Sequence, residues 1–170
     1  KTMGTNPRTE EIMKTIPNFL RNSDRILELV EKHLHLFKPR EGKDLHASII
    51  PNVFSQFTSL KDVNMTKELK DAIFADADFD ELLKDTYSFI QIQKYEPGDY
   101  IAPHTDAYAI TKLHLITLTT SDIDGLVCET KDHKLEKIYD RAGTYIDFPY
   151  DSFHWVDPVK SRRFSLVIGE

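Results

Sequence analysis

The feature that most constrains the fold is a series of short alternating segments in the second half of the chain. In each of these segments, apolar and polar residues alternate, and polar turns separate one segment from the next. A period of two is typical of strands that bury one face. Several such strands at close spacing predict an antiparallel sandwich or barrel. The predicted strands are 89–95, 112–119, 125–129, 134–139, 143–148 and 162–168.

The first half of the chain has a helical pattern instead. Apolar residues recur at helical spacing over 26–37, behind Ser23 or Asp24 as a helix cap. Thr66 can cap a second helix, which carries Leu69, Ile73 and Phe74. Short strands are also predicted at 12–16 and 47–50.

These patterns predict one domain over residues 1–170. Its class is α+β, mainly β. Residues 1–87 form a helical N-terminal support, and residues 88–170 form a β core with the helices packed on the sheet. A length of 170 residues with 40% hydrophobic content is enough to bury a core in one domain.

Composition also restricts the partners and the compartment. The net charge of −6 disfavours nucleic acid as a partner, because binding to its backbone relies on Lys and Arg. No apolar run reaches the ~18 residues of a membrane span, and no signal-peptide pattern opens the sequence. Cys128 is the one cysteine, which excludes an internal disulfide and suits a reducing compartment. We therefore expect a cytoplasmic protein with no membrane segment.

Three residues have the spacing of a metal site. His104 and Asp106 are two apart in a predicted strand, so their side chains point to the same side. Alone, this pair also fits a hydrogen-bonded couple in a turn. His154, about fifty residues later, follows a turn and opens an aromatic strand; it also fits a packed residue of that strand. Two imidazoles and one carboxylate leave half of an octahedron open, as a non-haem Fe(II) oxygenase requires.

A second group of residues suits a carboxylate ligand. Arg163 and Ser165 share one face of the last predicted strand, whereas Arg162 points to solvent. A guanidinium beside a hydroxyl can hold a buried carboxylate through paired hydrogen bonds.

Two other candidate metal sites fail on geometry. Residues 76–87 begin like a calcium loop but have Glu81 at the sixth position, where Gly is needed, and Tyr87 at the twelfth, where Glu is needed. His33 and His35 are two apart on a predicted helix and diverge by about 200°, so they cannot share a metal.

The combined motifs resemble the Fe(II)- and 2-oxoglutarate-dependent dioxygenases, in particular the prolyl-hydroxylase-like branch. The resemblance covers about half of the chain, from Phe89 to Ile168. It rests on four pieces in the right order: the segment 95–106, the segment 142–149, the segment 154–159 and the pair Arg163-x-Ser165. It implies a double-stranded β-helix, or jelly roll, as the core.

The resemblance also implies roles for individual residues. His104, Asp106 and His154 would be the catalytic residues that hold Fe(II). Arg163 and Ser165 would bind the far carboxylate of the cosubstrate 2-oxoglutarate. Tyr95 would be a hydrogen-bond donor to it, although it also fits a core tyrosine. Side chains expected in the substrate pocket are Gln91, Gln93, Tyr100 and Trp155.

The implied reaction uses O2 to hydroxylate a protein side chain, such as prolyl, or an amino acid, with release of succinate and CO2. The partner is then a protein, a peptide or a small-molecule substrate. Two alternatives stay open: a cupin-type metal-dependent jelly-roll enzyme that does not use 2-oxoglutarate, and a non-catalytic ligand-binding module on the same fold. The Arg163-x-Ser165 pair argues against the first, and the intact metal residues argue against the second.

Overall fold

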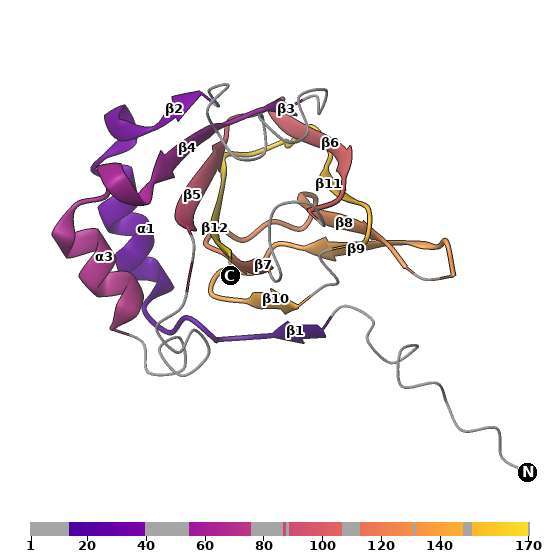
Figure 1. The fold of residues 1–170 in the computed structure, drawn as a ribbon, viewed down its shortest axis with the longest axis horizontal. Coiled ribbons are helices and arrows are strands. Elements are labelled where there is room, and N and C mark those ends of the chain that lie inside the picture. Colours follow the sequence, from indigo (N-terminus) through magenta and orange to yellow (C-terminus); the bar gives the residue numbers. More distant parts are fainter. Residues whose placement is uncertain are drawn as a thin grey trace, which may run out of the picture.

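Two antiparallel β-sheets pack against each other, and helices cover the outer face of the larger sheet (Figure 1). The computed structural model describes residues 14–39, 55–75, 87, 89–106, 113–130, 132–147 and 151–169. The predicted strand 47–50 and most of the segment 76–87 lie outside these ranges.

The larger sheet has seven strands among the described residues, in the order β1-β10-β7-β12-β5-β4-β2. They are β1 (Lys14–Ile16), β10 (Tyr145–Asp147), β7 (Leu113–Thr117), β12 (Arg163–Gly169), β5 (Phe89–Tyr95), β4 (Thr58–Lys61) and β2 (Lys38–Pro39). The smaller sheet has five in the same described part, in the order β3-β6-β11-β8-β9. They are β3 (Ser55–Gln56), β6 (Tyr100–His104), β11 (His154–Val156), β8 (Gly125–Glu129) and β9 (Leu135–Tyr139).

The strands from β5 to β12 form a double-stranded β-helix. Each connection along this stretch passes from one sheet to the other, except the β8–β9 hairpin, which stays within the smaller sheet. This confirms the predicted mainly-β fold class. All six strands predicted by alternation are present, with ends that differ by a few residues.

The N-terminal part is more than a helical support, because it also extends both sheets. β1 pairs with β10, β4 pairs with β5, and β3 pairs with β6. Open strand edges expose unpaired backbone groups, so these short strands cover edges of the β-helix. The predicted strand at 12–16 is confirmed as β1, whereas the strand character of β2 to β4 was missed.

The helices are short and amphipathic, as the spacing predicts. They are α1 (Ser23–Glu31) and α3 (Lys67–Phe74), with 3-10 turns η2 (Leu34–Leu36) and η3 (Asp62–Asn64). Thr66 caps α3 as predicted, since its Oγ1 accepts a hydrogen bond from the backbone N–H of Leu69 at 3.2 Å. The predicted cap of α1 is wrong by at least one residue: Asn22 is the N-cap, and its Nδ2 donates to the Ala72 carbonyl, 2.6 Å away. No helix in the described ranges is long and apolar enough to cross a bilayer.

Strand β12 separates two cores by simple alternation. Phe164, Leu166 and Ile168 pack with the helices in one core. Val167 belongs to the second core, between the two sheets. Arg163 and Ser165 share its parity and are fully buried. The interior of the β-helix therefore carries polar groups at one end of β12 and apolar groups further along it.

The turn after β9 requires glycine, and we predict its substitution to be costly. Gly143 has φ +81°, and an added Cβ would lie 2.7 Å from the Leu20 carbonyl oxygen. Gly98 has φ +94°, but nothing lies within 4 Å of its added Cβ. Gly98→Ala is therefore the matched control, with conformational strain of about 1–2 kcal/mol and no clash. We expect Gly143→Ala to lower the free energy of unfolding by a larger amount in urea titrations. Equal losses in the two variants would contradict the clash.

Candidate metal centre

The two histidines predicted as ligands lie directly opposite each other. His104 ends β6, His154 begins β11, and the two residues are Cα partners in the antiparallel pairing. Their ring centroids are 4.3 Å apart. Neighbouring strands of one sheet thus bring together two residues that are fifty positions apart in the chain.

A bulge in β6 gives His104 its direction. His154 pairs with His104, but Val156 pairs with Ile101, so β6 contains one residue more than β11 between these two pairs. An extra residue re-aims the side chains that follow it. Ile101 and His104 are three positions apart, yet Ile101 enters the core between the sheets and His104 reaches the metal centre.

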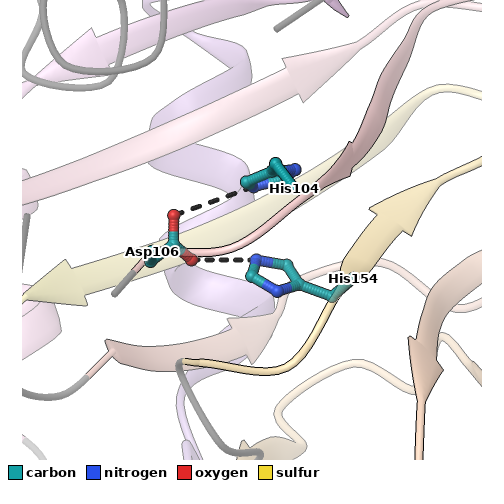
Figure 2. A group of neighbouring side chains, drawn as sticks. All are labelled: His104, Asp106 and His154. Atoms are coloured by element: carbon teal, nitrogen blue, oxygen red, sulfur yellow. Dashed lines mark ion pairs between the residues drawn. The ribbon is translucent and has the colours of Figure 1, made fainter. Parts of the chain in front are cut away.

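Asp106 completes the group from outside the strand. β6 ends at His104, so strand alternation does not place Asp106 as the sequence analysis assumed. The chain nevertheless turns its carboxylate toward both rings (Figure 2). Oδ2 lies 2.8 Å from Nε2 of His154, and Oδ1 lies 3.7 Å from Nε2 of His104. All three residues are buried, and their potential ligand atoms lie within 4.8 Å of one another.

Backbone carbonyls determine which ring nitrogens are available. Nδ1 of His104 lies 2.7 Å from the Ala102 carbonyl oxygen, and Nδ1 of His154 lies 2.9 Å from that of Ser152. A carbonyl oxygen only accepts, so each Nδ1 carries the hydrogen, and Nε2 of a neutral ring keeps its lone pair. Metal-binding histidines typically donate their other N–H in this way.

The donor set fits a divalent transition metal. Two Nε2 lone pairs and an ionised carboxylate are all acceptors, so they repel one another unless a cation or a proton lies between them. Two imidazoles and one carboxylate suit Fe(II) with open positions. Among the residues that the structure describes, no other three or more His, Cys, Asp or Glu side chains lie close enough together to hold a metal ion, and His33 and His35 are not part of such a group.

Cys128 lies next to this centre in the sheet but is not one of the three candidate ligands. It is the Cα partner of His154 on β8. Burial raises the pKa of its thiol to about 12, so the thiol is neutral at physiological pH. Cys128 is not part of the group of ligand atoms that lie within 4.8 Å of one another, which consists of His104, Asp106 and His154.

A second polar cluster lies on the facing sheet, on β5 and β12. Arg163 pairs with Tyr95, and Ser165 pairs with Gln93. The Tyr95 hydroxyl donates to Oε1 of Gln93 at 3.1 Å, and the Ser165 hydroxyl donates to the same oxygen at 3.5 Å. The Tyr95 ring lies beneath the guanidinium, with 5.3 Å from Cζ of Arg163 to the ring centroid. The structure thus brings together the residues predicted for the cosubstrate.

The sequence analysis missed the partner of Arg163. Asp140 follows β9 and is as deeply buried as the arginine. Its Oδ2 accepts from Nε of Arg163 at 2.8 Å, and its Oδ1 accepts from Nη2 at 3.2 Å. Burial raises the pKa of the Asp140 carboxyl, and the Arg163 cation opposes that rise. Burial opposes the charge on Arg163, but Asp140, together with Tyr95 and Asp124, outweighs this effect, and the pKa of the guanidinium is raised. No sequence pattern separates this aspartate from an ordinary turn residue.

The residues predicted for the substrate pocket divide between two faces. Gln91 pairs with Val167 and Gln93 bonds to Tyr95, so both glutamines share the inner face as predicted. Trp155 lies between His154 and Val156, which face inward, so alternation directs it outward, where its Nε1 donates to Asp157 at 3.2 Å. Tyr100 precedes the inward Ile101 and is half-buried. Pocket roles for Trp155 and Tyr100 stay predictions that this placement does not favour.

His114 belongs to neither the metal centre nor the surface. It is buried, and its Nδ1 lies 2.8 Å from the hydroxyl of Tyr145, a residue of the helix-side core. Its Cα partner on β12 is Ile168, which also belongs to the helix-side core.

Solved structures with this architecture were found at low sequence identity. A 2OG-Fe(II) oxygenase family oxidoreductase from Burkholderia pseudomallei aligns with a TM-score of 0.66 and 15% identity, over 99% of this chain and 90% of that one. A Pseudomonas putida prolyl-4-hydroxylase aligns with 0.63 and 15%, over 92% and 90%. The non-heme α-ketoglutarate-dependent epimerase SnoN from nogalamycin biosynthesis aligns with 0.62 and 12%, over 95% and 78%. No protein-family model and no curated protein matches the sequence.

The chain has the fold of the 2-oxoglutarate–Fe(II) oxygenases. The jelly-roll core expected from the motifs is therefore present, from β5 to β12. The metal centre described above lies inside this fold.

We predict that His154 is required for metal binding. His154→Ala removes one of three donors, and we expect the affinity for Fe(II), or for Co(II) as a spectroscopic substitute, to fall about a hundredfold or more. Isothermal titration and the Co(II) absorption spectrum measure this change. His133→Ala is the matched control, because His133 is exposed and bonds to Glu129. Unchanged affinity in His154→Ala would contradict the assignment.

Proposed function

We propose that this protein is an Fe(II)- and 2-oxoglutarate-dependent oxygenase that hydroxylates a protein side chain, such as prolyl, or an amino acid. The observation that carries the proposal is a group of two histidine Nε2 atoms and one carboxylate. The Nδ1 atom of each histidine is held by a backbone carbonyl. This group occurs within a fold that is shared with a solved structure described as an oxidoreductase of the 2OG-Fe(II) oxygenase family.

His104, Asp106 and His154 would hold the metal on one face. Two imidazoles and one carboxylate would leave coordination positions open for a cosubstrate. Fe(II) bound there would supply the redox chemistry that converts 2-oxoglutarate and O2 to succinate and CO2 while a substrate C–H bond is oxidised. The protein's own contribution at this end is to keep both Nδ1 atoms protonated and both Nε2 lone pairs directed inward.

Arg163 and Ser165 would bind the far carboxylate of 2-oxoglutarate. The guanidinium carries five N–H groups, and the pair with Asp140 uses one on Nε and one on Nη2. The Nη1 edge lies outside this pair and can face a ligand carboxylate. Tyr95 would donate to the cosubstrate only if its hydroxyl turned away from Gln93. Burial raises the pKa of Tyr95, so its hydroxyl keeps its proton.

The substrate class rests on weaker support than the chemistry. One of the similar structures is a prolyl-4-hydroxylase, and the motif resemblance favours the same branch. SnoN, described as an epimerase, has the same fold, so the fold alone does not select hydroxylation. Gln91 and Gln93 offer amide groups on the inner face, which suit hydrogen bonding to a peptide or amino-acid substrate.

We expect Arg163 to be required for cosubstrate binding. Fe(II) and 2-oxoglutarate should give a weak visible absorption band under anaerobic conditions, and Arg163→Gln should abolish it at cosubstrate concentrations that saturate the native protein. Arg162→Gln is the matched control, because Arg162 is the next residue but is exposed and bonds to Glu96. Circular dichroism verifies the fold of each variant.

Removing only Arg163 leaves Asp140 buried without its partner, which is destabilising. If Arg163→Gln does not fold, the double variant Arg163→Gln/Asp140→Asn removes both charges and carries the same test. An unchanged band in a folded variant would contradict the cosubstrate assignment. It would favour the cupin-type alternative, in which Arg163 serves only as the partner of Asp140.

Turnover should depend on a substrate of the proposed class. We expect succinate release under air to rise when prolyl-containing peptides or free amino acids are added, with a mass gain of one oxygen in the substrate. Asp106→Ala should lower this release to the background without protein, because the metal loses its carboxylate. Metal-independent ligand binding with no succinate under any condition would favour the non-catalytic binding module.

A further inference from the structure

The ion pair between Asp140 and Arg163 has a directional geometry. Asp140 follows β9 in the smaller sheet, and Arg163 begins β12 in the larger one. The carboxylate grips the side edge of the guanidinium, formed by Nε and Nη2. Both side chains are at most 2% exposed, so water does not compete for these hydrogen bonds.

Other contacts restrict the same guanidinium. The Tyr95 ring covers one of its faces. The backbone N–H of Asp140 donates to the Asp124 carbonyl at 3.0 Å. The Asp124 carboxylate in turn accepts from the backbone N–H groups of Lys160 and Ser161, at 2.8 and 3.1 Å, in the turn that leads to Arg163. Asp124 therefore ties the backbone of Asp140 to the turn that carries its partner.

We infer that Asp140 is a positioning residue for the far carboxylate of 2-oxoglutarate, an inference that rests on the proposed function. Asp140 occupies the side edge of Arg163 and thereby presents the Nη1 edge to the ligand. The Tyr95 ring sets the plane of the guanidinium, and Asp140 sets its rotation within that plane. The remaining N–H groups of Arg163 therefore point in one direction. Five donors in a planar fork make such a division between two carboxylates possible.

The charge of the pair explains why direction matters here. A buried arginine without a counter-ion is strongly destabilising, and Asp140 supplies the counter-ion before any ligand binds. The pair as a whole is neutral, so a second carboxylate gains little from net charge. Its recognition then depends on hydrogen-bond geometry, which Asp140 controls. Without Asp140, the arginine could turn its side edge to the ligand, and the set geometry would be lost.

The test uses the full chain with Fe(II), under anaerobic conditions, and two keto acids. 2-Oxoglutarate carries the far carboxylate, whereas 2-oxovalerate has a methyl group in its place and the same metal-binding end. We expect Asp140→Asn to raise the Kd for 2-oxoglutarate, read from the absorption band, about tenfold or more. The Kd for 2-oxovalerate should stay unchanged.

Asp122→Asn is the matched control, because Asp122 is exposed and bonds to Arg141. If Asp140→Asn does not fold, Asp140→Glu takes its place: it keeps the charge but displaces the carboxylate by one methylene, so the same change with a smaller magnitude is expected. An unchanged or lower Kd for 2-oxoglutarate overturns the inference, and so does an equal rise for both keto acids. Absence of any band in the native protein overturns the proposed function, and this inference with it.

Discussion

The antiparallel pairing of β6 with β11 is the constraint on which the candidate site depends. It sets His104 directly opposite His154, and a bulge in β6 lets both the apolar Ile101 and the polar His104 face inward. A shift of one residue in this register would turn His104 away from His154. The pairing of two strands in one sheet therefore positions both histidines of the candidate metal centre. Asp106, two residues after the end of β6, completes it.

In the larger sheet, β12 positions the second polar cluster. Its alternation sends Phe164, Leu166 and Ile168 into the helix-side core, where they stabilise the packing of α1 and α3. The same alternation places Arg163 and Ser165 in the interior, so one strand both anchors the helices and carries the polar cluster. Buried polar groups are tolerated only when they are hydrogen-bonded, and Asp140 and Gln93 supply these partners.

Local patterns in the sequence were sufficient for much of this arrangement. Alternation predicts six of the eight strands from β5 to β12, and the motif spacing selects His104, Asp106 and His154, which the structure brings together. Strand parity correctly separates Arg163 from the exposed Arg162. What could not be predicted depends on pairing between distant segments. The bulge in β6 appears only in its register with β11, and β2 to β4 are strands through their pairing with β4, β6 and β5.

Asp140 is the most informative of the missed residues. It lies 23 positions before Arg163 and directly after β9, a strand of the other sheet, so only the closure of the β-helix makes them partners. An arginine in a cosubstrate motif is usually considered for its positive charge, but here that charge is already balanced within the fold. Under the proposed function, this neutral pair would hold a dicarboxylate through the direction of its hydrogen bonds, and that direction depends on both members. The selectivity of this end of the site therefore belongs to the pair and cannot be assigned to Arg163 alone.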